Sequence, residues 1–353
     1  MAAACDPQVF SSAVSAHLQL PNGLDGSAHT AVRRLVDRYL TPERVADLEP
    51  HVRATARELC AGLAAGVQKR PAVLRCDAVG DIGAVFAVRA QIRWLGWSET
   101  QEERLLAWME ENRRATQSGS PEETAAVAAD FDSIILTEIR PRRAAGAGAP
   151  ADVTTELIHD TELGRPLRDE EIVSVLRNWT GGDLGSLALS TGVVVEFLAA
   201  HPEIQTQLRG GVPEAEFDAI LDEILRIDDP FVSNRRVTTC PVKLGDADLP
   251  VGARVVLDWT SANRDEELFA DPDAFDPAGN SSANLVYGTG PHVCPGRALA
   301  TMELRVIVSE LLAHFSEIAL DHEAAPVRSQ APTGGYSAVP VVLTPTAPGT
   351  GLP

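Results

Sequence analysis

The residues best suited to chemistry lie in one short segment near the end of the chain. Gly288, Gly290 and Gly296 surround a single cysteine, Cys294. Glycines allow backbone conformations that are closed to other residues, and they let the backbone approach a flat ligand closely. A helix is expected from residue 297, and its free N–H groups and dipole would stabilise a thiolate. The segment can therefore hold a stabilised thiolate, and the alternative is a glycine-rich turn with a buried cysteine.

The segment from Tyr287 to Glu303 resembles the haem-binding loop of the cytochrome P450 family. The family pattern is an aromatic residue, two glycines, a His or Arg, the ligand cysteine, and a further glycine before a helix. The resemblance implies haem b as the cofactor, with the Cys294 thiolate as axial ligand to iron, an arrangement that favours O–O cleavage. It implies four further cofactor contacts: Tyr287, Gly288, His292 and Gly296.

Pro295, directly after the expected ligand, departs from that chemistry because proline has no N–H. One possible hydrogen-bond donor to the sulfur is therefore missing. Fewer hydrogen bonds should leave the thiolate richer in charge and the iron harder to reduce.

Glu223 and Arg226 match the ExxR signature of the family. An acid and a base at this spacing also occur on many solvated helices, so the pair gains its weight from its distance to the cysteine loop. The implied role is structural, as a buried ion pair. In the family a third basic residue joins the pair, and Gly279 occupies its position here. The network is then either weakened or completed by Arg264.

Basic residues at four places match those that bind the haem propionates in the family. His29 and Arg33 lie one turn apart on an expected helix. Arg236 opens a strand after the ExxR helix, and His292 lies just before the cysteine. Such donors suit carboxylates because they form charge-assisted hydrogen bonds. For His29 and Arg33 the alternative is an ordinary position on a surface helix.

The longest expected helix, 169–201, should cross the open face of the haem. In the family its middle carries an acid and a threonine that relay protons to dioxygen. The register places Gly185 at the acid position and Ser186 at the alcohol position, while Asp183 lies on nearly the same face. We predict that Asp183 and Ser186 form the catalytic relay. The alternative is that Asp183 accompanies a local helix bulge and that the protein is poor at monooxygenation.

The segments expected around the substrate pocket are mostly apolar or small, which favours a hydrophobic or aromatic substrate. Pocket-lining positions do not name a compound. The residues that we expect in this wall are Trp179, Gly182, Phe231 and Val232.

Composition limits the class of protein. A net charge of −20 and 5% aromatic residues argue against nucleic-acid binding. No apolar run approaches the roughly 20 residues of a membrane span, and residues 1–20 lack a signal-peptide pattern. The 5 cysteines are widely spaced without CxxC pairing, which favours a reducing cytoplasm over a disulfide framework.

Helical periodicity dominates the chain, and residues 234–257 alternate in the manner of short strands. The fold class is therefore mainly α with small β-sheets. Residues 143–152 and 271–284 should be coil. Helices are predicted at 29–40, 42–65, 81–95, 103–114, 121–140, 169–201, 213–226 and 297–315.

The resemblance covers nearly the whole chain and implies a single haem-thiolate domain, residues 1–343, followed by a disordered tail, 344–353. Residues 6–12 resemble the end of the helix that precedes the substrate loop in the family. The N-terminal helix and first strands of the family have no counterpart before that point. We therefore expect a cytochrome P450 fold that lacks them.

The function implied is a monooxygenase that inserts one oxygen atom of O2 into a small organic substrate, as enzymes of secondary metabolism do. Electrons would come from a ferredoxin-type partner, docking where Arg297 and the 33–34 arginines offer positive charge. Peroxide-driven oxidation or oxidative coupling is an alternative activity. A catalytically silent haem-thiolate scaffold that recruits a partner is a third hypothesis.

Overall fold

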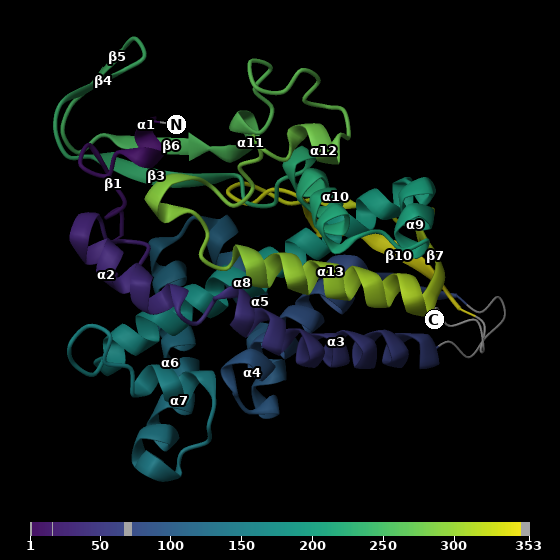
Figure 1. The fold of residues 1–353 in the computed structure, drawn as a ribbon, viewed down its shortest axis with the longest axis horizontal. Coiled ribbons are helices and arrows are strands. Elements are labelled where there is room, and N and C mark those ends of the chain that lie inside the picture. The colour runs from purple at the N-terminus through teal and green to yellow at the C-terminus, as the bar shows by residue number, and fades with distance from the viewer. Residues whose placement is uncertain (1, 16, 67–72, 347–353) are drawn as a thin grey trace.

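The computed structural model describes residues 2–15, 17–66 and 73–346, and the expected tail beyond 346 lies outside them. The architecture is mainly helical, with small sheets at the periphery (Figure 1). The α-helices are α1 (Ala2–Cys5), α2 (Gly26–Asp37), α3 (Pro42–Ala65), α4 (Val85–Leu95), α5 (Glu102–Ser118), α6 (Pro121–Ala145), α7 (Val153–Ile158), α8 (Asp169–Ala200), α9 (Pro202–Arg209), α10 (Glu214–Ile227), α11 (Trp259–Ala262), α12 (Pro277–Asn280) and α13 (Arg297–His314).

The strands pair antiparallel throughout the described residues. One three-stranded sheet has the order β1-β3-β6, a second has the order β2-β10-β7, and two hairpins complete the set. The strands are β1 (Phe10–Ser11), β2 (Leu74–Asp77), β3 (Ser233–Thr238), β4 (Val242–Leu244), β5 (Ala247–Leu249), β6 (Arg254–Asp258), β7 (Phe315–Leu320), β8 (Val327–Arg328), β9 (Tyr336–Ala338) and β10 (Pro340–Pro345).

Helix α8 runs through the middle of the molecule (Figure 1). Its start is fixed by a capping box, in which the Glu171 carboxylate accepts a hydrogen bond from the Arg168 N–H at 2.9 Å. Pro202 follows its last turn and begins α9. In the described part of the chain, α8 is the one helix long and apolar enough to cross a membrane, and over half of that stretch is buried inside the protein. We interpret α8 as the core helix.

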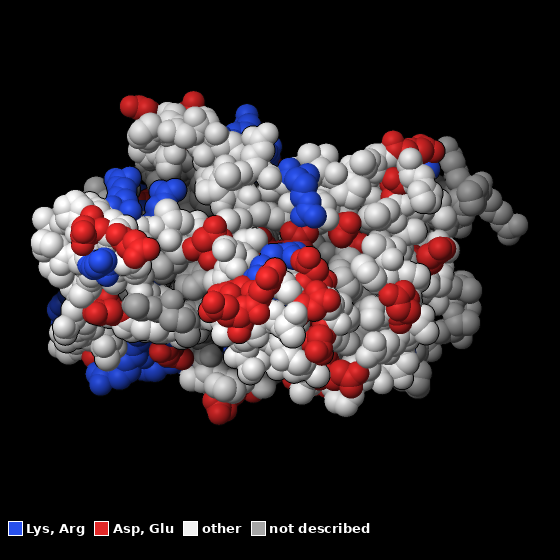
Figure 2. Space-filling view, turned by 90° about the horizontal axis from the view of Figure 1, so that it is seen from above, with Lys and Arg blue, Asp and Glu red and all other residues white. Residues whose placement is uncertain are grey.

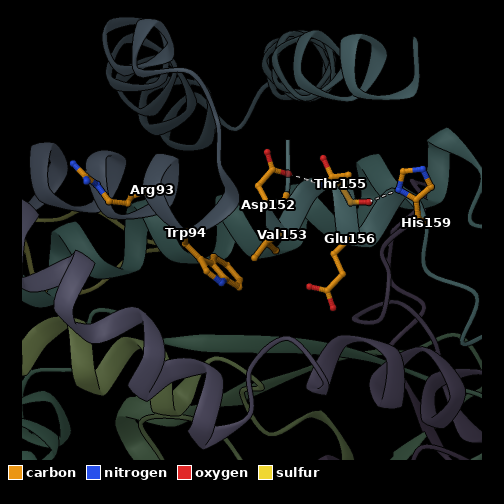
Figure 3. A pocket seen from close by; sticks show the side chains of 8 residues that line it. Arg93, Trp94, Asp152, Val153, Thr155, Glu156 and His159 are labelled. Carbon is orange, nitrogen blue, oxygen red and sulfur yellow. Dashed lines mark hydrogen bonds between the residues drawn. The ribbon is translucent and has the colours of Figure 1, made fainter. Parts of the chain in front are cut away.

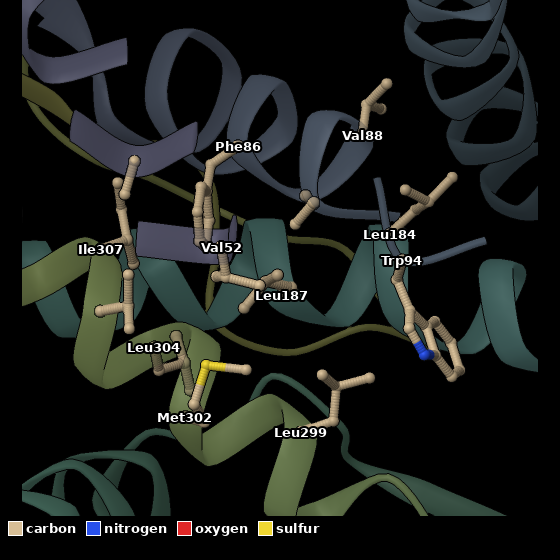
Figure 4. Packing of buried hydrophobic residues seen from close by; sticks show 14 of the residues in the cluster. Val52, Phe86, Val88, Trp94, Leu184, Leu187, Leu299, Met302, Leu304 and Ile307 are labelled. Carbon is tan, nitrogen blue, oxygen red and sulfur yellow. The ribbon is translucent and has the colours of Figure 1, made fainter. Parts of the chain in front are cut away.

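Side chains from α3, α4 and α13 pack against α8 (Figure 4). Leu184 and Leu187 of α8 are 0% and 1% exposed. Burying each leucine-sized side chain contributes roughly 1.5–3 kcal/mol. Their labelled partners in Figure 4 include Val52, Phe86, Leu299, Met302, Leu304 and Ile307. This packing holds α8 opposite the cysteine loop, because the loop leads directly into α13.

The expected helices that become α3, α8, α10 and α13 are confirmed to within two residues. The other four predicted helices, which become α2, α4, α5 and α6, differ by three to five residues at one end or both. Two of these differences have a cause in local hydrogen bonds. The segment expected as a helix from 81 begins as a π-helix, η1 (Ala78–Ala84). The Asp77 carboxylate caps this helix by accepting hydrogen bonds from the N–H groups of Val79 and Gly80. Helix α6 continues past Pro141 because the buried Arg142 guanidinium bonds the Glu138 carbonyl and the Asp152 carboxylate, both at 2.8 Å.

The ends of the described chain also differ from expectation. Helix α1 stops at Cys5, and Phe10 and Ser11 form a strand opposite Thr238 and Val237. Strand β10 runs to Pro345, past the expected domain end at 343, because β7 pairs with it there. Within the expected coil at 271–284, the Asp276 carboxylate caps the short helix α12.

Charge is spread over the surface rather than gathered in one basic stripe. The face at the top of Figure 1, seen directly in Figure 2, carries more acidic than basic side chains. This agrees with the net charge of −20. Many of the arginines are paired with acids. Because acids outnumber bases in the chain, the electrostatic field around the molecule is negative.

Candidate active site

An internal cavity lies between α8, the end of α10, the start of β3 and the cysteine loop. Its volume is about 300 Å³. Segments far apart in the sequence therefore meet around one space. The predicted site residues that line it are Trp179, Gly182, Asp183, Ser186, Phe231, Arg236, Tyr287, Gly288, His292, Cys294 and Gly296.

The cysteine loop is held by its own backbone. The Cys294 N–H donates to the Tyr287 carbonyl at 2.9 Å. Gly288 and Gly290 have φ values of +71° and +75°, in the region that favours glycine. A Cβ on Gly290 would lie 2.8 Å from the Ala4 carbonyl oxygen, so α1 can approach the loop only where no side chain stands. These contacts present the sulfur toward the cavity.

The surroundings of Cys294 suit a metal ligand. Burial raises the pKa of its thiol, while the backbone N–H of Gly296 and the positive charges of Arg33 and Arg297 act in the opposite direction. Helix α13 begins at Arg297 and adds the field of its N-terminus. Pro295 supplies no N–H. A thiol in this setting ionises when a cation such as iron replaces its proton.

Basic side chains crowd together at one edge of the cavity. The rings of His29 and His292 are 4.1 Å apart, and the buried His29 Nε2 has no hydrogen-bond partner among the described residues. Burial, followed by the charges of His29 and Arg236, lowers the pKa of His292 to about 4. Asp25 faces the group, with its carboxylate 3.6 Å from His292 Nε2. His292 Nε2 also lies 3.0 Å from the Ser12 hydroxyl, and Arg236 donates to the Arg235 carbonyl, so His29 Nε2 is the atom of this group without a partner in the described part of the chain. A buried ring nitrogen in that state fits a carboxylate of haem, so the site fits this cofactor.

Three predicted contacts are not among the residues that line the cavity. His29 reaches its edge only through the ring of His292. Arg33 donates from one guanidinium nitrogen to the carbonyls of Pro291 at 3.1 Å and Val293 at 2.8 Å, and so braces the loop from behind. Its contact with a propionate stays a prediction. Val232 does not line the cavity, because its side chain lies against Gly334, where a Cβ would be only 2.8 Å away.

Glu223 and Arg226 form a buried ion pair, with nitrogen–oxygen distances of 2.7 and 2.9 Å. The guanidinium is 0% exposed and also donates to the carbonyls of Asn263 and Pro272 at 2.8 and 2.9 Å. It lies over the ring of Phe269 at 4.8 Å. The pair therefore ties α10 to the coil before the cysteine loop, which is the structural role that the resemblance implies.

The third partner of this network is an amide rather than a base. Asn280, next to Gly279, donates from its side chain to the Glu223 carboxylate at 2.8 Å. The Asp276 N–H donates to the same oxygen at 3.0 Å. Arg264 contacts Asp273 and the Ile227 carbonyl instead. The expectation that Arg264 completes the network is therefore wrong, because Asn280 already occupies the position.

Asp183 and Ser186 both reach the cavity, but their side chains are not bonded to each other. The Ser186 hydroxyl donates back to the Gly182 carbonyl at 2.6 Å. The Asp183 carboxylate accepts a hydrogen bond from the Gln91 side chain at 2.5 Å. Burial raises the pKa of Asp183 to about 6. A proton passing between the two residues would need a bridging water, and the open space beside Gly182 and Gly185 has room for one.

Gln91 and Asn280 are the contacts that the sequence reasoning missed. Gln91 is 0% exposed in α4, among apolar neighbours in Val-Phe-Ala-Val-Arg-Ala-Gln-Ile-Arg-Trp-Leu. A glutamine on the apolar face of a helix is a usable signal, because a buried amide needs a partner. Asn280 carried no comparable signal, since it lies in a coil rich in small polar residues.

A second hollow opens on the outside of α4 and α7 (Figure 3). Most of its polar groups are bonded within the protein, although the Thr155 hydroxyl has no partner among the described residues. The Asp152 carboxylate accepts from the Thr155 N–H at 2.7 Å, and His159 Nδ1 lies 2.9 Å from the Thr155 carbonyl. The Glu156 carboxylate is bound by Arg44. We therefore place the active site in the inner cavity.

Comparison with known proteins agrees with this geometry. Residues 217–340 match the cytochrome P450 family model. The chain is 30% identical over 335 residues to cyclomarin C epoxidase CymV of Salinispora arenicola, covering 90% of this chain and 81% of that protein. It is 27% identical over 351 residues to the steroid C26-monooxygenase of Mycobacterium tuberculosis, covering 97% and 92%. The structure of a P450 EryK mutant in complex with erythromycin B has a TM-score of 0.83 at 26% identity, covering 99% of this chain and 90% of that one.

The fold and the site define a haem-thiolate protein, and the chain belongs to the cytochrome P450 family. It is a P450 monooxygenase, and the relatives that it resembles are named as an epoxidase, a monooxygenase and a hydroxylase. The family works with a haem-thiolate cofactor, a redox partner, dioxygen and an organic substrate. This replaces the hypothesis of a catalytically silent scaffold.

Proposed function

We propose that the enzyme binds haem b through the Cys294 thiolate and inserts one oxygen atom of O2 into a small hydrophobic or aromatic substrate. The observation that carries the proposal is the shared cavity, where the cysteine loop faces the glycine-rich part of α8. When bound, haem supplies the iron that activates dioxygen. The residues of this chain hold the cofactor, exclude bulk water and manage protons.

Residues on two sides of the cavity would hold the cofactor. Cys294 would ligate the iron, while His29, His292 and Arg236 would bind the propionates. The unpaired His29 nitrogen and the crowding of these groups support this role. Tyr287 supports the loop from within, since its hydroxyl lies 3.0 Å from the Thr301 hydroxyl.

Proton delivery would rest on Asp183 with Ser186. Asp183 holds a proton that it can release near neutral pH, because burial raises its pKa to about 6. Ser186 would pass that proton on after its hydroxyl leaves the Gly182 carbonyl. Replacing Asp183 by Asn, which cannot ionise, should lower the fraction of reductant recovered as product.

The substrate side of the cavity supports an apolar ligand with a few polar contacts. Trp179, Trp259 and Phe231 contribute aromatic surface, and Phe231 is half exposed at 50%. The amides of Asn22 and Asn178 bond to each other at 3.0 Å in the same wall. A hydrophobic or aromatic compound would bury these rings, with the gain that apolar burial gives.

We propose a ferredoxin-type electron donor and a cytoplasmic location. The five cysteines are free throughout the described residues, as in proteins of a reducing compartment. The exposed Arg34 and Arg297 are paired with Glu162 at 2.6 Å and Asp222 at 3.0 Å. Acids of a partner would compete for these arginines, so electron transfer should slow as salt is added.

The deciding experiment is an absorbance spectrum of the purified, reduced, carbon-monoxide-bound protein. A red-shifted Soret band would support thiolate ligation, and its loss in Cys294→Ser would assign the ligand. Turnover with a surrogate ferredoxin and reductase then tests monooxygenation. Product formed with hydrogen peroxide alone would favour the peroxide-driven alternative. The observation behind that alternative is that the Ser186 hydroxyl donates to the Gly182 carbonyl and not to the Asp183 carboxylate. A normal haem spectrum with no product from either electron source would contradict the proposal.

A further inference from the structure

A neutral amide from a different helix holds the Asp183 carboxyl. Gln91 of α4 is fully buried, and its Nε2 donates to Asp183 Oδ2 at 2.5 Å. The other end of the amide, Oε1, is buried and has no hydrogen-bond partner in the described ranges 2–15, 17–66 and 73–346. Buried polar atoms of this kind are normally satisfied. The amide nitrogen of Gln91 is therefore hydrogen-bonded, and its amide oxygen is free to accept a hydrogen bond.

The free amide oxygen of Gln91 matters because it lies next to an acid that can carry a proton. A glutamine amide carries donors on nitrogen and an acceptor on oxygen, and the two ends can exchange by rotation about the last side-chain bond. The nitrogen end satisfies a carboxylate. The oxygen end accepts from a protonated carboxylic acid. One residue can thus hold Asp183 in the same place before and after a proton transfer.

The titratable groups on which the charge of Asp183 acts are themselves acids. Glu303 of α13 is 0% exposed, and both its carboxyl oxygens are without a partner in the part of the chain that the structure describes. Burial, and then the charge of Asp183, raises the pKa of Glu303 well above its ordinary value. Cys294 feels the charge of Asp183 as well. Since no cation pairs with Asp183 among the described residues, Gln91 is the polar side chain that bonds and orients it.

We propose that Gln91 is a positioning residue for proton delivery, which keeps the Asp183 carboxyl directed at the cavity in both protonation states by alternating its amide nitrogen and oxygen. The proposal rests on the role of Asp183 in the proposed function. The proton moves from the Asp183 carboxyl into the cavity, and a proton from solvent later replaces it, so that no net charge accumulates. Gln91 itself neither gains nor loses a proton.

A purely structural Gln91 would fill the space between α4 and α8 and no more. Gln91→Met separates the two roles, because methionine keeps the chain length and approximate volume but has neither a strong donor nor a strong acceptor. Gln91→Glu keeps a donor only while the new acid is protonated. The matched control is Gln205→Met, since Gln205 is also buried and donates to the Leu198 and Ile318 carbonyls at 2.7 and 2.8 Å.

The test uses the haem-loaded enzyme and two readouts over a pH series. Infrared difference spectra follow the carboxylic acid band that disappears in Asp183→Asn, and product per reductant is measured beside it. Gln91→Met should raise the midpoint of the band by about one pH unit, because both hydrogen bonds are lost and the one to the charged carboxylate is the stronger. It should lower product per reductant about tenfold. Gln91→Glu should recover part of that loss at acidic pH, and Gln205→Met should change neither readout.

An unchanged band midpoint in Gln91→Met, with normal haem content, would overturn the proposal. Equal changes in Gln205→Met would overturn it too, because they would reflect stability alone. If Gln91→Met does not retain haem, the pH-dependent recovery in Gln91→Glu decides the question. If Asp183→Asn leaves product per reductant unchanged, the relay of the proposed function fails, and the infrared midpoint still reports whether Gln91 holds Asp183.

Discussion

Two sites that hold acids inside this molecule differ in what surrounds them. Glu223 is 1% exposed and accepts hydrogen bonds from Arg226, Asn280 and a backbone N–H. Asp183 has the single amide of Gln91, and Glu303 has no partner among the described residues. The first site holds a charge that is fully compensated. The second holds acids that burial pushes toward the neutral form.

The difference separates structural support from chemistry. A buried charge with a complete set of partners resists change, because removing any partner leaves the charge exposed to a low dielectric. A buried acid without a cation exchanges its proton more readily near neutral pH, at a cost to stability. The Glu223 site lies in the framework behind the loop, and Asp183 lies in the cavity wall. The predictions below test this contrast in order of the expected effect.

The largest effect should come from Arg226→Met. It leaves the Glu223 carboxylate buried without its cation, and we expect a loss of about 3–5 kcal/mol in the free energy of unfolding, measured by urea denaturation. The double variant Glu223→Gln with Arg226→Met should recover part of that loss. A single variant that unfolds within about 1 kcal/mol of the parent would place the pair among the weak surface bridges.

Asp183→Asn should increase the free energy of unfolding, whereas Arg226→Met lowers it. The folded pKa of Asp183 is raised to about 6 from 3.8, so the unfolded chain ionises first as pH rises. The parent protein therefore loses stability between about pH 4 and 6, and the asparagine variant does not. We expect the variant to be more stable by up to about 3 kcal/mol at pH 7 and equal to the parent below about pH 4.

Asp160→Asn is the control for that prediction, because the Asp160 carboxylate accepts from the Tyr39 hydroxyl at 2.8 Å and lies 3.6 Å from Arg38. The same substitution there should lower stability at pH 7. If thermal melts across the pH range gave both variants the same sign, the contrast between partnered and unpartnered acids would fail.

Asn280→Ala should cost less than the loss of Arg226. It removes one hydrogen bond to the charged Glu223, and we expect about 1.5 kcal/mol of destabilisation. Ser281→Ala is the neighbouring control, since its exposed hydroxyl bonds only a local carbonyl at 3.2 Å. Equal melting temperatures for the two variants would show that Asn280 is not part of the network.

The smallest effect on stability should come from Pro295→Ala, which acts on the Cys294 thiol. Alanine restores an N–H beside the sulfur and should stabilise the thiolate, so the reduction potential of the haem should rise. Spectroelectrochemical titration measures the shift, with Pro291→Ala as a control in the same loop. An unchanged or lower potential would mean that the new N–H does not reach the sulfur.

Much of the cysteine side of the site followed from the sequence. The pattern from Tyr287 to Gly296 is local, and its positive-φ glycines and the helix start behind Cys294 depend on neighbours a few residues away. The ExxR pair and the long central helix were likewise readable from spacing and periodicity. Such features are set by short-range sterics and hydrogen bonding, which the order of residues carries directly.

The sequence by itself determined the haem-thiolate loop, the central helix and the family to which they belong. The tertiary structure decided which side chains complete them. Asn280 rather than Arg264 reaches Glu223, Val232 turns away from the cavity, and Gln91 comes from another helix to hold Asp183. These outcomes depend on how α4, α8, α10 and the coil before the loop pack together. Contacts between distant segments are fixed by the shape of the whole core, and no local spacing records that shape.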